Sequence, residues 1–142
     1  MKVTILKQLS EETFIRVGEL LHMLDAEAPA LDEQRLKMLL ENEDFTLFAA
    51  QDEDGMIAGM LTLTRCHTLS RGKYWIEDVI VDSRFRGMGA GRALVKAAVE
   101  YAGKQEESPS IYLTSNPSRV SARALYRSEG FEEYDTGVFR IV

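Results

Sequence analysis

Three glycines alternate with other residues in segment 86–92, which reads Arg-Gly-Met-Gly-Ala-Gly-Arg. The segment follows an apolar, strand-prone run and precedes a helical pattern. The unpaired N–H groups of a helix start therefore converge on whatever anion approaches it. Glycine lets the backbone come close to a ligand because it has no Cβ, and Arg86 and Arg92, with Arg84 nearby, stay charged near neutral pH. The pattern predicts a site for a phosphate group.

Two familiar phosphate motifs do not fit this turn. A P-loop needs Gly-Lys followed by Ser or Thr, and the chain contains no such triplet. A dinucleotide fingerprint needs a glycine where Arg92 stands, and too few residues follow to complete a doubly wound sheet. A nicotinamide-dependent enzyme is therefore a weaker competing hypothesis, which predicts thermal stabilisation by NAD.

Two adjacent carboxylates in the strand-prone run 74–81 are candidates for acid–base chemistry. The two-residue period of a strand predicts that Glu77 shares one face with the apolar side chains of Trp75, Val79 and Val81. Desolvation there raises the pKa of a carboxyl, which suits Glu77 as a general base. Asp78, expected on the opposite face with Ile76 and Ile80, is the reserve candidate. A purely structural role for either carboxylate stays open at this stage.

The remaining pattern predicts the elements that hold these residues in place. The expected strands cover residues 2–8, 45–50, 56–64, 74–81, 111–114, 131–134 and 138–142. Helices are expected after the N-caps Ser10 and Asp32, over residues 90–102, and from Asn116-Pro117 through Ser128. Asp54-Gly55 marks a hairpin turn. The order indicates a mixed α/β domain with one buried parallel segment.

Composition limits the class of protein. The chain has 142 residues, 45% hydrophobic and 28% charged, which is typical of a soluble globular domain, so we expect one domain over residues 1–142. The net charge is −6, which argues against non-specific binding to nucleic acid. Cys66 is the only cysteine, so an internal disulfide or a Cys-rich metal cluster is excluded. No apolar run is long enough to cross a membrane, and we expect a cytoplasmic protein without a bound metal.

Three segments together resemble one known family. The turn contains Arg86-x-x-Gly89-x-Gly91, which resembles the R/Q-x-x-G-x-G/A signature of the GCN5-related N-acetyltransferases. Upstream, residues 76–81 resemble the fourth strand of that family. Downstream, Ala122-x-x-Leu125-Tyr126-x-x-x-Gly130-Phe131 resembles its last helix and the strand after it. The resemblance covers about residues 74–131, whereas the first 70 residues match only in the order of predicted elements.

The resemblance implies a fold and a cofactor site. The fold would be a strongly twisted mixed sheet of six to seven strands, with splayed central parallel strands, about four helices and acetyl-CoA in the gap. The implied cofactor-binding residues are Val79, Ile80 and Val81 along the strand edge, and Arg86, Gly87, Met88, Gly89, Ala90, Gly91 and Arg92 around the diphosphate. Where family members often carry Asn, this chain has Arg119. Asn116, three residues earlier, is therefore either a cofactor contact or only a helix cap.

By the same resemblance, the activity is transfer of an acetyl group from acetyl-CoA to a primary amine, by direct attack in a ternary complex. Tyr126 stands where the catalytic tyrosine of the family lies, and a phenol with a reference pKa near ~10 can protonate the leaving thiolate. Glu77 would be the base. The acceptor is a small-molecule or peptide amine, and a homodimer is compatible with the family. The alternative function is a non-catalytic acyl-CoA-binding module with the same fold.

Overall fold

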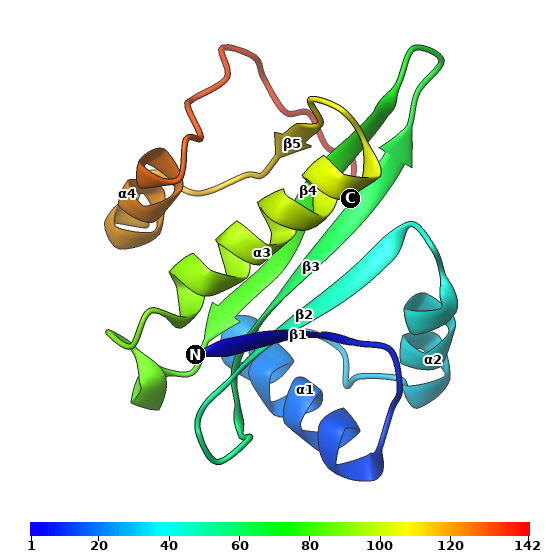
Figure 1. The fold of residues 1–142 in the computed structure, drawn as a ribbon, viewed down its shortest axis with the longest axis vertical. Coiled ribbons are helices and arrows are strands. Elements are labelled where there is room, and N and C mark those ends of the chain that lie inside the picture. The colour runs from blue at the N-terminus through cyan, green and yellow to red at the C-terminus, as the bar shows by residue number, and fades with distance from the viewer.

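A five-stranded mixed sheet runs through the centre of the molecule (Figure 1). The computed structural model describes residues 1–142. The strands lie side by side in chain order: β1 (Lys2–Leu6), β2 (Phe45–Gln51), β3 (Ile57–His67), β4 (Gly72–Val81) and β5 (Ser110–Tyr112). All neighbours pair antiparallel except β4 and β5, which are parallel. The predicted mixed α/β class is confirmed, with five strands instead of six to seven.

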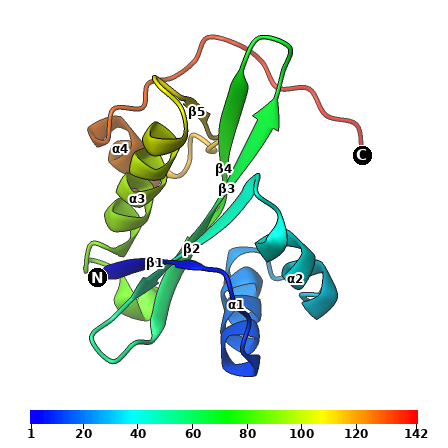
Figure 2. The ribbon, with the colours of Figure 1, turned by 45° about the vertical axis from the view of Figure 1, so that its right-hand side comes forward.

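Helices cover both faces of this sheet (Figure 2). One face carries α1 (Glu11–Leu24) and α2 (Glu33–Glu41), and the other carries α3 (Ala90–Gln105), with α4 (Val120–Ser128) beside it. The predicted N-caps are present: Ser10 accepts the N–H of Thr13, and Asp32 accepts the N–H groups of Gln34 and Arg35. None of the helices is both long and apolar enough to cross a bilayer.

Two apolar cores hold these layers together, one on each face of the sheet. Phe48 and Leu61 pack with Leu94 and other residues of α3, whereas their strand neighbours Leu47 and Met60 pack against α1 and α2. Because successive strand residues point to opposite faces, burial of both faces makes β2 and the first seven residues of β3 largely apolar. The layered core therefore explains why the sequence of this hairpin shows little alternation.

The residue Asp78 interrupts the regular pairing of β3 and β4. Thr62 lies opposite Glu77, but Met60 lies opposite Ile80, so β4 has one residue more than β3 over this stretch. The extra residue forms a β-bulge, and Asp78 has a left-handed backbone with φ of 51°. The side-chain alternation therefore changes phase after Glu77.

This bulge corrects the predicted faces of β4. Val79 and Val81 pack on the α3 side, in the core that also contains Ile76, whereas Ile80 packs on the α1 side. Asp78 contacts Thr62, the cross-strand partner of Glu77. The prediction that Glu77 shares a face with Val79 and Val81, and that Asp78 points the other way, is wrong because strict alternation cannot cross a bulge.

The C-terminal segment differs from the prediction. Residues 131–142 form no strand, so the expected strands 131–134 and 138–142 are wrong. Phe139 and Ile141 are 96% and 100% exposed, and no neighbouring strand pairs with them. Strand propensity without a partner or a buried face does not order a segment as sheet.

The start of α4 also lies later than expected. The Asn116 side chain accepts the N–H of Ser118 in a turn before the helix, and the helix itself begins at Val120. Local hydrogen bonding by Asn competes with helix formation, which explains the delay. The helix ends as predicted, with Gly130 at a φ of 96°.

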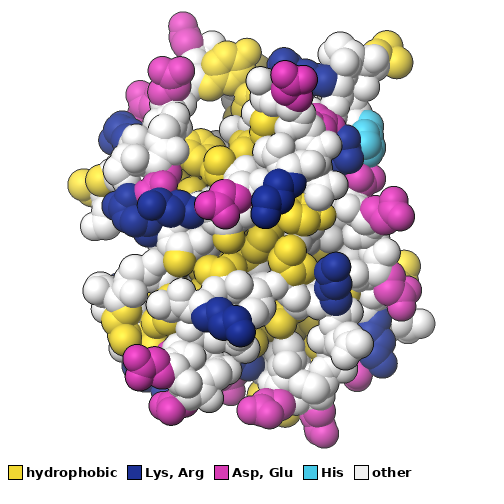
Figure 3. Space-filling model, viewed as in Figure 1, with side chains coloured by type: hydrophobic (Ala, Val, Ile, Leu, Met, Phe, Trp, Pro, Cys, Tyr) yellow, Lys and Arg dark blue, Asp and Glu magenta, His cyan; other side chains and the backbone are white.

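The surface seen in Figure 1 carries charges of both signs. Lys and Arg side chains lie among Asp and Glu side chains on this face, and neither sign covers it (Figure 3). A phosphate-backbone binder concentrates its basic residues on one face or along one stripe. The visible face has no such stripe.

Candidate active site

A pocket of about 420 Å³ opens where β4 and the segment after β5 separate. The parallel pairing joins only Lys73–Trp75 of β4 to β5, so the strand beyond Trp75 has no neighbour on that side. The lining residues come from four parts of the chain: Leu21, Leu24, Asp25 and Ala28; Ile76, Glu77, Asp78 and Val79; Leu113 and Thr114; and Arg119 and Tyr126. The fold therefore brings Glu77 and Tyr126 to one pocket.

Glu77 is the carboxylate whose protonation the pocket perturbs. Burial raises the pKa of Glu77 above its ordinary value, and the negative charge of Asp78 raises it further. Both causes disfavour the charged form, so the group is a stronger proton acceptor than a surface carboxylate. The expected direction of this pKa shift is confirmed.

Asp78 lines the same pocket but has a different environment. Oγ1 of Thr62 donates a hydrogen bond of 2.8 Å to Oδ2 of Asp78, and the Thr62 side chain is buried. One carboxylate oxygen of Asp78 is therefore occupied within the sheet. Glu77 is the carboxylate that keeps both oxygens available to a ligand.

Tyr126 lies on α4 and is only 6% exposed. Its ring packs edge-on against Phe131, with 6.1 Å between the ring centroids. Burial raises the pKa of the Tyr126 phenol, and the positive charge of Arg119 partly opposes that shift. The phenol is therefore protonated at neutral pH and can act as a proton donor.

The glycine turn exposes a continuous run of unpaired amides. Between η1 (Ser83–Phe85) and α3, Gly87 and Gly89 adopt left-handed backbones with φ of 79° and 81°. After Arg86, the next backbone N–H that donates a hydrogen bond is that of Ala93, to the carbonyl of Gly89 at 3.0 Å. The amides of residues 87–92 have no acceptor within the protein. Three of these N–H groups belong to the turn and three to the first turn of the 16-residue helix α3, and together they form a strong site for an anion.

Two of the three nearby arginines are held by carboxylates. Arg84 donates to Asp82. Arg92 donates to Ser128 Oγ at 3.0 Å and forms an ion pair with Glu129, so it joins the start of α3 to the end of α4. Arg86 is exposed and forms no ion pair. Arg86 is therefore the arginine that keeps its charge available beside the amides.

Asn116 and Arg119 are separated by the turn before α4. The oxygen of the Asn116 side chain is occupied by the N–H of Ser118, whereas Arg119 lines the pocket beside Tyr126. The geometry thus favours Arg119 over Asn116 as the residue that reaches a ligand in the pocket.

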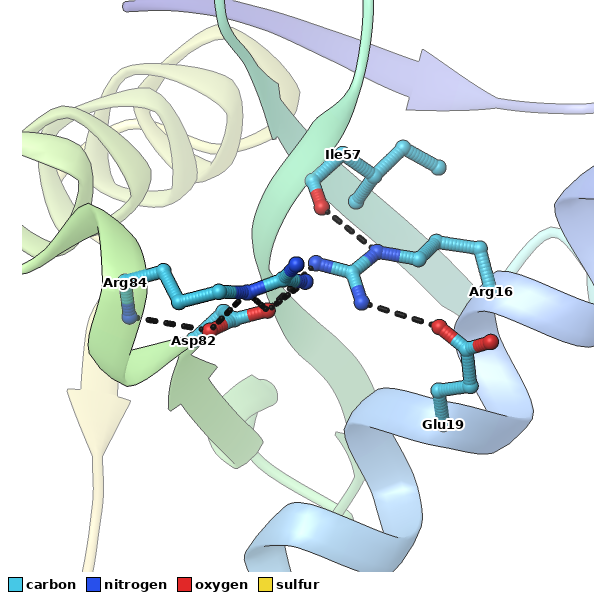
Figure 4. Close-up of polar contacts among 5 residues, drawn as sticks. All are labelled: Arg16, Glu19, Ile57, Asp82 and Arg84. Carbon is cyan, nitrogen blue, oxygen red and sulfur yellow. Dashed lines mark hydrogen bonds and ion pairs between the residues drawn. The ribbon is translucent and has the colours of Figure 1, made fainter.

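Sequence reasoning missed an ion cluster around a buried carboxylate behind the glycine turn (Figure 4). Asp82, directly after β4, is 1% exposed and accepts hydrogen bonds from Arg16 of α1 and from Arg84. The two arginines, Arg84 first and Arg16 second, hold the pKa of this carboxyl well below its usual range. A signal was present, because Arg16 lies one helical turn from the apolar Leu20 and Asp82 ends an apolar run.

Comparison with known proteins identifies the family. The acetyltransferase (GNAT) family matches residues 6–131. An uncharacterised N-acetyltransferase of Bacillus subtilis, YhfO, is 35% identical over 107 residues, which cover 74% of this chain and 70% of that protein. A spermine/spermidine N(1)-acetyltransferase of the same species is 28% identical over 61 residues, or 43% of this chain and 40% of the relative. The chain spans from 20% to 70% of the length of such curated relatives.

A solved structure shows the same fold. It is an aminoglycoside acetyltransferase from an uncultured soil metagenomic sample, in complex with sisomicin. It superposes with a TM-score of 0.83 at 20% identity, over 99% of this chain and 95% of the other. Sheet order, glycine turn and pocket, together with the match over residues 6–131, establish that the chain belongs to the acetyltransferase (GNAT) family.

Proposed function

We propose that this protein transfers the acetyl group of acetyl-CoA to a primary amine of a small molecule or a peptide, by direct attack in a ternary complex. The observation that carries the proposal is the shared pocket of Glu77 and Tyr126. A proton acceptor and a proton donor, contributed by β4 and α4, face one space of about 420 Å³. Acetyl transfer from a thioester to an amine needs both groups.

The residues around the pocket fit acetyl-CoA. The unpaired amides of residues 87–92 and the free Arg86 suit the diphosphate. The open side of β4 at residues 79–81 offers main-chain groups to an extended, amide-containing arm, as an added strand would use them. Arg119 is closer to this site than Asn116, and Arg92 contributes mainly by holding α3 against α4.

The steps of acetyl transfer can each be assigned to a group in the site. Acetyl-CoA supplies the thioester. Glu77, directly or through water, accepts the proton that the amine loses as its nitrogen bonds to the carbonyl carbon. Main-chain N–H groups near Val79 polarise the carbonyl oxygen, as in an oxyanion hole. The C–S bond breaks, and Tyr126 donates the proton that the departing thiolate takes up.

The other wall of the pocket suits a cationic acceptor. Leu21, Leu24 and Asp25, at the end of α1, line it opposite β4. Three carboxylates, Asp25, Glu77 and Asp78, face one arginine, so the lining favours a positively charged ligand. Polyamines and aminoglycosides, the classes named for two relatives, are therefore the first acceptors to test.

The decisive experiment is the release of free CoA from acetyl-CoA across a panel of amines. The panel contains polyamines, aminoglycosides, amino acids, peptide amino termini and a lysine peptide. We expect acceptor-dependent release that Tyr126→Phe strongly reduces. Binding of acetyl-CoA without such release, equal in the wild type and in Tyr126→Phe, would instead support the acyl-CoA-binding module. The single domain over residues 1–142, the homodimer and the cytoplasmic location stay predictions.

A further inference from the structure

A single buried arginine ties α1 to the sheet and to the exit of β4 (Figure 4). Arg16 is 7% exposed. Its Nε donates to the carbonyl of Ile57 at 2.8 Å, its Nη1 donates to Glu19 at 3.0 Å, and its Nη2 donates to Asp82 Oδ2 at 2.8 Å. All three nitrogens of the guanidinium are therefore used, each toward a different element or turn. A planar group held on three sides fixes both distance and direction.

Asp82 is the acceptor at the centre of this cluster. Besides Arg16, its carboxylate accepts the N–H of Arg84 at 3.0 Å and Nη2 of Arg84 at 2.7 Å. Its own N–H donates to the carbonyl of Ala58 at 2.8 Å. Both the side chain and the main chain of Asp82 are thus fixed at the residue where β4 ends and η1 begins.

The cluster stands between the two halves of the candidate site. On one side, the last turns of α1 carry Leu21 and Leu24, which line the pocket. On the other side, η1 leads directly from Asp82 into the glycine turn and its unpaired amides. The same carboxylate therefore determines where the turn leaves the sheet and where α1 lies against it.

We propose that Arg16 and Asp82 are positioning residues for cofactor binding, which fix the direction of the amides of residues 87–92 and couple that turn to the acceptor wall formed by α1. The inference rests on the proposed function, since it takes the diphosphate of coenzyme A as the ligand of those amides. An apolar pair would hold the elements together but would not specify the direction in which the turn leaves β4. Asp82 specifies it, because its carboxylate accepts four donors, one from Arg16 of α1 and three from Arg84 of η1.

The test measures binding of coenzyme A to the whole chain by calorimetry, well below the unfolding temperature. For Asp82→Asn we expect the dissociation constant of coenzyme A to rise by about tenfold to a hundredfold, as the loss of one hydrogen bond to a charged group would cause. The kcat at saturating acetyl-CoA and amine should stay within about threefold, because binding and not the chemical step is affected. If Asp82 had only a structural role, its substitution would lower the unfolding temperature without raising the dissociation constant of coenzyme A.

Two further variants separate positioning from stability. Glu106→Gln breaks the ion pair of Glu106 with Arg65, which joins the end of α3 to β3 at a distance from the glycine turn. We expect this variant to have lower stability and unchanged affinity for coenzyme A. The double variant Arg16→Met with Asp82→Leu replaces the buried pair by apolar contacts, which often restores stability. We expect it to fold and still bind coenzyme A weakly.

The outcomes are distinct. Recovery of wild-type affinity in the apolar double variant, or unchanged affinity in Asp82→Asn, would overturn the positioning role. If Asp82→Asn does not fold, the double variant decides alone. If the wild type itself does not bind coenzyme A, the proposed function fails and the inference fails with it.

Discussion

The hydroxyl of Thr62 donates a 2.8 Å hydrogen bond to Asp78 at the one residue that β4 has in excess of β3. This contact holds the carboxylate of Asp78 beside Glu77, at a backbone φ of 51° that side-chain-bearing residues rarely adopt. The bulge therefore places two carboxylates on the wall of one pocket. A regular strand would have sent one of them into the α3 core.

The left-handed backbone of Asp78 predicts an unusual order of stability among its variants. Asp78→Gly and Asp78→Ala both lose the hydrogen bond from Thr62, but only glycine adopts the required backbone at no steric cost. Asp78→Ala should therefore be less stable than Asp78→Gly by about 1 kcal/mol, measured by urea unfolding. Equal stability of the two variants would contradict the bulge.

Glu77→Gln tests the general base. We expect kcat/KM to fall by about 10²-fold to 10⁴-fold, the usual contribution of a positioned base. Because the pKa of Glu77 is raised, wild-type activity should be lost as the pH falls through a value above that of an ordinary glutamate, and the variant should lack this step. The variant should be no less stable than the wild type at pH 7, since a raised carboxyl pKa disfavours the charged form on folding.

Asp78→Asn is the matched control for that experiment. It removes the neighbouring charge in the same pocket, and we expect a smaller loss of activity together with a lower pKa for Glu77. A larger loss than in Glu77→Gln would transfer the role of base to Asp78.

Tyr126→Phe removes one oxygen and keeps the packing of the ring against Phe131. The expected result is a fall in kcat of about 10²-fold. Affinity for coenzyme A should be unchanged. Because the pKa of the phenol is raised, wild-type activity should be lost at a higher pH than an ordinary tyrosine would give, and this alkaline step should disappear in the variant. Thiol release at saturating substrate, followed across pH, measures the fall in kcat and the alkaline step. Retention of full kcat in the variant would show that Tyr126 is not the proton donor.

Gly89→Ala should weaken the amide site through the backbone alone. A Cβ at this position would meet no atom within 4 Å, but the φ of 81° strains any residue other than glycine. We expect a stability loss of about 1 kcal/mol. We also expect weaker binding of coenzyme A, measured by calorimetry.

Gly103→Ala, in the same helix and equally open, is the control for Gly89→Ala. It should raise stability by about 0.5–1 kcal/mol, because glycine in a helix interior is less favourable than alanine. Its affinity for coenzyme A should be unchanged. Similar losses of affinity in both variants would mean that the turn has no special role.

The buried carboxyl of Asp82 predicts how stability depends on pH. Its folded pKa is lowered, so its contribution is present above the unfolded value of about 3.9 and is lost as the pH falls toward the folded pKa. At pH 7, Asp82→Asn should cost about 3 kcal/mol, as breaking a buried pair does. The difference from wild type should shrink below about pH 4. A difference independent of pH down to the acid transition would exclude the ionic contribution.

The sequence was most informative where the pattern is local. The hairpin of β2 and β3, the strand β4 and the helix α3 follow from apolar periodicity, from the turn at Asp54-Gly55 and from the alternating glycines. The pocket residues Glu77 and Tyr126 were also proposed from sequence, Tyr126 through the family resemblance. Local spacing and turn chemistry are short-range properties, and a sequence carries them directly.

The errors concern relationships between distant segments. The bulge at Asp78 depends on register with β3, and no pattern within β4 alone announces it. Residues 138–142 have strand propensity but no partner. The pairing of Arg16 with Asp82 joins positions 66 residues apart. Tertiary contacts determine the bulge, the unpaired C-terminal segment and the ion pair, and the periodicity of the sequence carries no information about such contacts.

Only three residue pairs join β5 to β4, and the strands then separate around the pocket. Few strand hydrogen bonds therefore hold residues 110–112 to the sheet, and we expect this edge to open more easily than the pairings among β2, β3 and β4. In the proposed function, an extended arm of the ligand lies in this gap and pairs with the open edge of β4 as an added strand. Binding and local folding are then coupled, and we expect amide exchange across residues 110–128 to slow when coenzyme A fills the gap.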